Sequence, residues 1–279
     1  MLSVYHNFSP FTTEKSRFSL APTQPMCYNK FQLGQFGAPF SLYSLMKGVE
    51  TCMNERIYNF SAGPSMLPLP VLQQAQKELL NCGGSGMSVM EMSHRSSSFD
   101  SIFQDTKARL RKLLQVSEDY EILFLQGGAT TQFSMVPLNL MGKTGRADYA
   151  LTGNFATKAY EEAQKYGVCS VAASSAEAHH TYIPRQEELA LDENASYFHY
   201  CANNTIFGTE WDYIPDTHGV PLVCDMSSNI LSKPVDVSRY GLIYAGAQKN
   251  MAPAGVTVVI LRRDLAGHAM DKTPVMLDY

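Results

Sequence analysis

The sequence predicts an α/β protein with a mostly parallel sheet flanked by helices. From Ile57 onward, short apolar runs alternate with amphipathic stretches, a pattern typical of strands that alternate with helices. The chain has 279 residues, of which 45% are hydrophobic and 17% are charged. It is therefore long enough to bury a sizeable core. No internal repeat or low-complexity tract interrupts the alternation.

Helices are predicted by turn residues and by apolar spacing. Pro68 and Pro70 suit the first turn of a helix, and the apolar residues that follow them recur at helical spacing. A second helix is expected over residues 100–114 and a third over residues 156–166. The strand candidates are short apolar runs at residues 122–125, 149–151, 197–200, 221–224 and 242–245.

Charge and cysteine usage exclude several classes of protein. The formal net charge is -4, which gives no electrostatic footprint for a nucleic acid. No apolar run reaches the roughly 18 residues that a membrane helix needs. The six cysteines are scattered without metal-ligand spacing, so we expect reduced thiols, no metal and a cytoplasmic location.

Residues 1–52 differ from the rest of the chain. They are rich in Ser, Thr, Phe, Tyr and Pro, and their only acidic residues are Glu14 and Glu50. They are interpreted as an unpatterned extension, either upstream read-through before a start at Met53, a targeting segment or a disordered arm. Residues 53–279 are expected to form the main domain.

Lys249 follows the apolar run 242–244 and precedes the apolar segment 254–261. A lysine between two buried segments is typical of a group whose charge is removed by burial or by Schiff-base chemistry. A solvated loop lysine is the alternative. Because ligands of open α/β sheets bind beyond the carboxyl ends of the strands, the residues after the other strand candidates bear on this choice.

The first two strand candidates are followed by residues suited to a phosphate and to a planar ring. After the first, a Gly-Gly pair permits close backbone approach, and Ala129 and Thr130 would offer N–H groups at a helix start. A tight turn is the alternative. After the second, Phe155 offers an aromatic face, with core packing as the alternative.

The remaining strand candidates are followed by polar and charged groups. Thr205 closes a cluster of hydrogen-bonding side chains, for which a turn is the alternative. Asp225 ends a buried strand and therefore implies a cationic partner, with a helix N-cap as the alternative. Together with Gln248 and Lys249, these groups are the parts that pyridoxal phosphate needs: a phosphate seat, a ring surface, an acid and an amine.

Five segments resemble the phosphoserine aminotransferase family of class-V pyridoxal-phosphate enzymes. They are NFSAGPSMLP (59–68), MSVMEMSHRS (87–96), LFLQGGAT (123–130), CDMSS (224–228) and DVSRYGLIYAGAQKNMAPAGVTVVI (236–260). The resemblance covers residues 57–279 and implies the large domain of the type I pyridoxal-phosphate transferase fold. It also implies reversible transfer of the amino group of L-glutamate to 3-phosphohydroxypyruvate, giving O-phospho-L-serine and 2-oxoglutarate. That reaction belongs to serine biosynthesis and, in bacteria, the family also serves pyridoxine biosynthesis.

The resemblance implies a role for each candidate residue. Lys249 would be the Schiff-base lysine that also moves the substrate proton, and Asp225 would keep the pyridine nitrogen protonated. His94 and Arg95 would bind the anionic groups of the substrates. The other cofactor-binding residues would be Ala129, Thr130 and Gln248 at the phosphate, Thr205 at the ring oxygen and Phe155 on the ring face. Family members are homodimers that build each active site from two subunits.

The sequence departs from the family at three places. Phe155 stands where many members have tryptophan, and Ala62 stands where some have serine. The chain ends before the family's C-terminal domain, which carries an Asn-Thr pair for the neighbouring cofactor and a second substrate arginine. A catalytically incomplete fragment that retains the cofactor-binding sheet is therefore the alternative. Another relative, such as a cysteine desulfurase or an alanine–glyoxylate type aminotransferase, is disfavoured by YAGAQKN and MSHRS.

Overall fold

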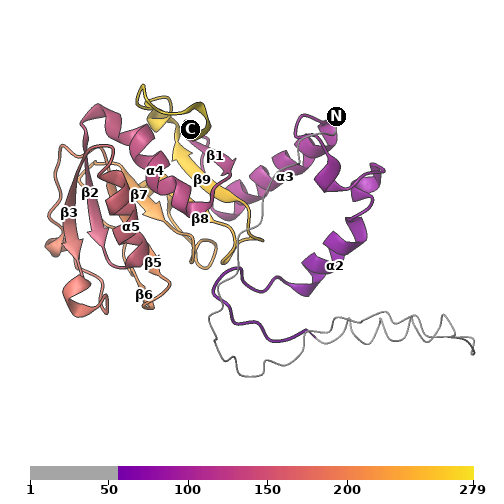
Figure 1. Ribbon diagram of the computed structural model, residues 1–279, viewed down its shortest axis with the longest axis horizontal. Coiled ribbons are helices and arrows are strands. Elements are labelled where there is room, and N and C mark those ends of the chain that lie inside the picture. Colours follow the sequence, from indigo (N-terminus) through magenta and orange to yellow (C-terminus); the bar gives the residue numbers. More distant parts are fainter. Residues whose placement is uncertain (1–55) are drawn as a thin grey trace, which may run out of the picture. The chain divides into compact units, whose positions relative to one another are not determined.

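The computed structural model describes residues 56–279, and the extension predicted over residues 1–52 lies outside them. Within Tyr58–Tyr279, the central element is a seven-stranded sheet with the order β1-β9-β8-β7-β4-β2-β3 (Figure 1). The strands are β1 (Tyr120–Leu125), β2 (Arg146–Leu151), β3 (Val168–Ser174), β4 (Phe198–Cys201), β7 (Leu222–Asp225), β8 (Leu242–Gly246) and β9 (Thr257–Arg262). A separate hairpin pairs β5 (Asn203–Asn204) with β6 (Thr209–Glu210).

The sheet is mostly parallel, which confirms the prediction. Strands β8, β7, β4, β2 and β3 pair with their neighbours in parallel. Strand β9 is the exception, because it pairs antiparallel with both β8 and β1. Strand β1 therefore runs in the same direction as β8, and the carboxyl ends of β1, β2, β4, β7 and β8 share one edge of the sheet.

All the predicted helices are present, with ends that differ from the predictions by a few residues. They are α2 (Leu69–Glu78), α3 (Ser97–Leu113), α4 (Gly128–Leu140) and α5 (Asn154–Ala163). Helix α2 carries proline in its first turn, and α3 begins where the side chain of Ser96 accepts a hydrogen bond from the N–H of Phe99, the usual N-cap arrangement. None of the helices within residues 56–279 is long and apolar enough to cross a membrane.

Both faces of the sheet are buried, as expected for parallel strands. On one face, α4 packs against α5 and β8, and α5 packs against β2 (Figure 1). The core beneath these helices includes Tyr149, Tyr197 and Tyr244. On the other face, Tyr200 and Ile243 belong to a second cluster. Side chains alternate along each strand, so neighbouring residues of one strand enter different cores.

Candidate active site

The residues after five strands of the sheet converge on one cavity of about 150 Å³. It lies at the edge where β1, β2, β4, β7 and β8 end, as the rule for open α/β sheets predicts. Every cofactor-binding residue predicted from the sequence lines it: Ala129, Thr130, Phe155, Thr205, Asp225, Gln248 and Lys249. The sheet thus brings together groups that lie far apart in the sequence.

Lys249 lies in the loop after β8 and is half-buried. Its Nζ donates a hydrogen bond to Oγ1 of Thr205 at 2.9 Å and lies 4.9 Å from the centre of the Phe155 ring. The lysine backbone is held by Ser65, whose hydroxyl donates to the Lys249 carbonyl and whose N–H donates to the Gln248 carbonyl at 2.9 Å. The amine is therefore aimed into the cavity and is not a freely solvated loop group.

Asp225 is the last residue of β7, and its side chain is buried, with 7% of the residue exposed. Burial raises the pKa of its carboxyl group, and hydrogen bonds from Ser227 and the charge of Lys249 oppose that rise. One hydrogen bond comes from the N–H of Ser227 to Oδ1 at 2.9 Å. No ion pair within residues 56–279 includes Asp225. A buried carboxylate in this state is stabilised by a cation that enters the cavity.

The start of α4 forms a seat for an anion. Its N-cap residue, Gly127, has a left-handed φ of 89° and provides no side-chain cap. The first N–H groups of the helix are therefore free to bind a ligand, and the helix dipole favours a negative charge there. Ala129 and Thr130 lie in this first turn. The tight-turn alternative is also correct in part, because Gly128 has a left-handed φ of 69°.

The Gly127→Ala variant is expected to destabilise the protein by about 1–3 kcal/mol, because alanine is strained at a left-handed φ. A Cβ atom at this position would also lie 2.8 Å from Cβ of Thr131 and push the first turn of α4. Urea unfolding and phosphate-ester binding measure the two effects. Gly219→Ala is the matched control, since Gly219 has a φ of 98° and open space around it, and it should lose stability without losing ligand affinity.

Two predicted residues lie elsewhere. His94 and Arg95 are exposed in the segment before α3, and neither lines the cavity. Asn203, Ser227 and Ser228 also line the cavity, and they received no role from the sequence. Asn203 donates to the hydroxyl of Ser228 at 2.9 Å, and the hydroxyl of Ser227 accepts from the N–H of Gly246 at 3.0 Å. Their only signal in the sequence was proximity to Thr205 and Asp225.

The lining residues fit pyridoxal phosphate. The free N–H groups at the start of α4 suit its phosphate, and the ring of Phe155 suits its planar face. The buried carboxyl group of Asp225 suits a protonated ring nitrogen, and the amine of Lys249 suits its aldehyde. Among residues 56–279 there is no group of three His, Cys, Asp or Glu that could hold a metal ion.

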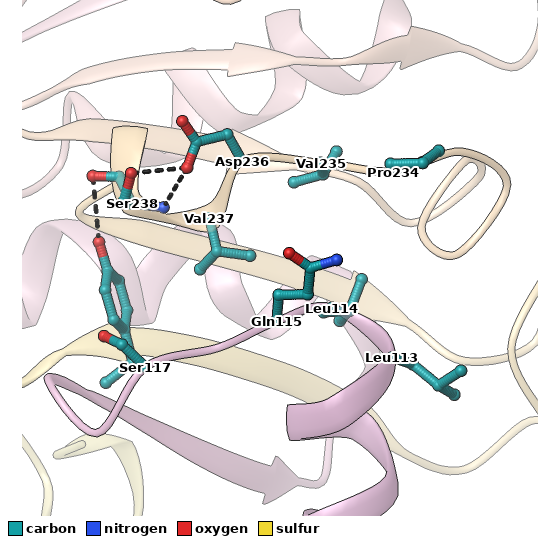
Figure 2. Close-up of a pocket in the computed structure, with 10 residues that line it drawn as sticks. Leu113, Leu114, Gln115, Ser117, Pro234, Val235, Asp236, Val237 and Ser238 are labelled. Carbon is teal, nitrogen blue, oxygen red and sulfur yellow. Dashed lines mark hydrogen bonds between the residues drawn. The ribbon is translucent and has the colours of Figure 1, made fainter.

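A larger cavity of about 330 Å³ lies between the end of α3 and residues 234–238 (Figure 2). Several of its polar groups are already hydrogen-bonded within the protein. The carboxylate of Asp236 accepts from both the N–H and the hydroxyl of Ser238 (Figure 2), and the hydroxyl of Tyr120 donates to the carbonyl of Tyr240 at 2.6 Å. The rest of the lining includes Leu113, Leu114 and Val237. It offers no amine, imidazole or free acid for catalysis.

The family model for aminotransferase class-V matches residues 57–275. Among curated relatives, the phosphoserine aminotransferase of Bacillus cereus is 57% identical over 225 residues, which are 81% of this chain and 62% of that protein. The phosphoserine aminotransferase of Ectopseudomonas mendocina is 53% identical over 227 residues, which are 81% of this chain and 63% of that protein. The chain thus spans about three fifths of the length of these relatives.

Solved structures agree with the sequence relatives. Phosphoserine aminotransferase from Bacillus circulans subsp. alkalophilus superposes with a TM-score of 0.79 at 47% identity, covering 81% of this chain and 63% of that one. The phosphoserine aminotransferase from Trichomonas vaginalis, solved with bound pyridoxal phosphate, gives a TM-score of 0.77 at 42% identity, covering 80% of this chain and 67% of that one.

Proposed function

The chain belongs to the class-V aminotransferase family, and from this we propose that it is a pyridoxal-phosphate enzyme. Its reaction is the reversible transfer of the amino group of L-glutamate to 3-phosphohydroxypyruvate, giving O-phospho-L-serine and 2-oxoglutarate. The observation that carries the proposal is the single cavity in which Lys249, Asp225 and the start of α4 meet. The identity to phosphoserine aminotransferases over 81% of the chain supports the substrate class.

When bound, pyridoxal phosphate supplies a ring that withdraws electrons from the carbon of the substrate that loses its proton. The carboxylate of Asp225 stabilises a proton on the ring nitrogen, and that positive charge strengthens the withdrawal. The amine of Lys249 would take the proton from Cα of the amino acid and deliver it to the aldehyde carbon of the cofactor, and it would move a proton the opposite way in the second half of the cycle. Its hydrogen bond to Thr205 and its place beside Phe155 orient the amine for this work.

The other lining residues bind and orient. The N–H groups of Ala129 and Thr130, with Gln248, would hold the phosphate of the cofactor at the positive end of α4. Thr205 would hydrogen-bond the cofactor and Phe155 would bind its ring. His94 and Arg95 bind the anionic groups of the substrates, since a guanidinium pairs with a carboxylate or phosphate through two hydrogen bonds.

We also infer that the enzyme is a homodimer and that it acts in the cytoplasm. We further infer a second activity, toward a phosphorylated threonine-like substrate in pyridoxine biosynthesis. Many of the exposed large apolar side chains belong to residues 57–102, where Phe60 is 92% exposed and Leu80 is 85% exposed, and contact with a second subunit would remove such surface from water. The free thiols of Cys82, Cys169 and Cys201 suit a reducing compartment.

The Arg95→Ala variant tests the substrate assignment. The purified chain, supplied with pyridoxal phosphate, should form phosphoserine from glutamate and 3-phosphohydroxypyruvate. Arg95→Ala should lower kcat/KM by about ten- to a hundredfold, because hydrogen bonds to charged groups contribute about 1.5–3 kcal/mol. The loss should appear mainly as a higher KM. Exposed Arg109, which pairs with Asp105 on α3, supplies the control, and Arg109→Ala should leave kcat/KM within about twofold.

The outcome distinguishes the candidate functions. Equal effects of Arg95→Ala and Arg109→Ala would remove Arg95 from the substrate site. Cofactor binding without any turnover by the unmodified chain would favour the alternative of a cofactor-binding unit that is catalytically incomplete. Absence of cofactor binding would contradict the proposal as a whole.

A further inference from the structure

Two buried side chains on the strands next to β7 lie near Asp225 and do not line the cavity. Strands β7 and β8 place Tyr244 opposite Asp225 in the register. Strand β4 contributes His199, which is opposite Val223, two residues before Asp225. Tyr244 is 0% exposed and His199 is 1% exposed. Nε2 of His199 lies 2.9 Å from the hydroxyl of Tyr244.

The protonation state of His199 follows from its surroundings. Burial lowers the pKa of the imidazole to about 3, so the ring is neutral and carries one N–H. Nδ1 has no hydrogen-bond partner in any other residue of the described range 56–279. A buried acceptor without a partner is tolerated better than a buried N–H without one. A proton on Nε2 makes His199 the donor to the hydroxyl oxygen of Tyr244.

When the hydroxyl oxygen of Tyr244 accepts from His199, the hydroxyl can still donate one hydrogen bond. Within residues 56–279 the Tyr244 hydroxyl is hydrogen-bonded to His199. Asp225 lies opposite Tyr244 in the register, and the tyrosine hydroxyl lowers the pKa of that carboxyl group. With Nε2 of His199 already donating, the remaining acceptor is the carboxylate of Asp225. The imidazole ring of His199 stacks on the ring of Tyr149, with ring centres 4.9 Å apart. This stacking restricts the orientation of the imidazole.

We propose that His199 and Tyr244 form a buried donor chain, from Nε2–H through the tyrosine hydroxyl to Asp225, that positions the Asp225 carboxylate toward the ring nitrogen of the cofactor. Both are positioning residues, because neither lines the cavity. The effect of the donor chain on the cofactor rests on the proposed function, whereas the arrangement of His199, Tyr244 and Asp225 does not. The chain opposes the desolvation that would otherwise protonate Asp225, and a protonated acid could not stabilise a cationic ring nitrogen.

The direction of the chain can be measured without any cofactor. In the purified chain labelled with 15N-histidine, the shifts of the His199 ring nitrogens report which one carries the proton, and a His199→Gln variant assigns the signals. We expect a neutral ring protonated on Nε2 near neutral pH. A ring protonated on Nδ1 would mean that Tyr244 donates to His199 and not to Asp225, and it would overturn the proposal.

The consequence for binding is tested by removing one hydroxyl. Tyr244→Phe should weaken the binding of pyridoxal phosphate by about ten- to a hundredfold, since it removes a hydrogen bond to a charged acceptor. It should not weaken the binding of the carbocyclic 1-deaza analogue, whose ring has no nitrogen for Asp225 to hold. A merely structural loss would weaken both ligands equally and would contradict the proposal.

Tyr197→Phe is the matched control. Tyr197 is equally buried in the same core and its hydroxyl is hydrogen-bonded to the hydroxyl of Tyr149 at 2.6 Å; within residues 56–279 no hydrogen bond joins it to Asp225. We expect it to leave both affinities within about threefold. If Tyr244→Phe does not fold, the histidine measurement on the unmodified chain still decides the proposal. If pyridoxal phosphate does not bind the unmodified chain, the proposed function fails, and the histidine tautomer again decides the donor chain independently.

Discussion

The Lys249→Ala variant is expected to lower the rate of amino transfer by about 10³-fold, which is the middle of the range for loss of a positioned acid–base group. The variant removes the amine that moves the Cα proton and that attaches to the cofactor aldehyde. The visible absorbance of lysine-bound pyridoxal phosphate should disappear with it. Steady-state kinetics and absorbance spectra of the reconstituted protein measure the two losses.

The loss should be chemical and not structural. Lys249 is half-buried, and within residues 56–279 its amine makes one hydrogen bond, to Thr205, so alanine should change the free energy of unfolding by less than about 1 kcal/mol. Lys249→Arg keeps the charge but lacks an amine that can attach to the aldehyde, and it should be as inactive as alanine. Lys233→Ala, which breaks only a pair with Glu210, should be fully active. Retention of more than a tenth of the activity in Lys249→Ala would refute the assignment.

The strand ends of the site could be predicted because each follows a short apolar run. Asp225 and Lys249 were found by this rule, and both line the cavity. The rule works because parallel strands are buried on both faces and read as continuous apolar segments. It failed for β3 (Val168–Ser174), an edge strand of small residues that is exposed at several positions. The rule also does not predict that β9 runs antiparallel to its neighbours β1 and β8, because that pairing depends on residues far apart in the sequence.

The support behind the site could not be predicted. His199 lies within an apolar run and looked like an ordinary strand residue, and its partner Tyr244 is 45 residues away in the sequence. The hydrogen bond from the hydroxyl of Ser65 to the carbonyl of Lys249 joins residues that are 184 positions apart in the sequence. Contacts of this kind depend on the strand order of the sheet, which local periodicity does not encode. His94 and Arg95 do not follow a predicted strand and were indicated only by the family resemblance. They lie outside the cavity lining.

The Asp225→Asn variant is expected to change activity and stability in opposite directions. Without the carboxylate, the ring nitrogen of the cofactor loses the charge that keeps it protonated, and kcat should fall by about 10²–10³-fold, as for loss of other preorganised electrostatic groups. In the protein without cofactor, however, Asp225 is a buried acid that forms no ion pair with any of the residues 56–279. Asparagine removes that burial penalty and should raise the free energy of unfolding by about 1–3 kcal/mol at neutral pH.

The pH dependence separates this effect from a change in packing. Burial raises the pKa of Asp225 above the ordinary value that it has in the unfolded chain. Between those two values the folded state binds more protons than the unfolded state, so the stability of the cofactor-free protein falls as the pH rises through this window. Asparagine does not titrate, so its advantage should be absent in acid and complete above the raised pKa. Urea unfolding of both proteins at a series of pH values measures the difference.

Cofactor binding should reverse the order of the two proteins. A ligand stabilises the folded state in proportion to its affinity, and the cationic ring nitrogen is the partner that the Asp225 carboxylate lacks. Saturating pyridoxal phosphate should therefore stabilise the unmodified protein more than Asp225→Asn. Asp225→Asn should be the more stable protein without cofactor and the less stable protein with cofactor bound. An equal gain in both proteins would mean that Asp225 does not contact the ring nitrogen. Reversal would identify Asp225 as a residue kept for its function at a cost to the stability of the empty protein.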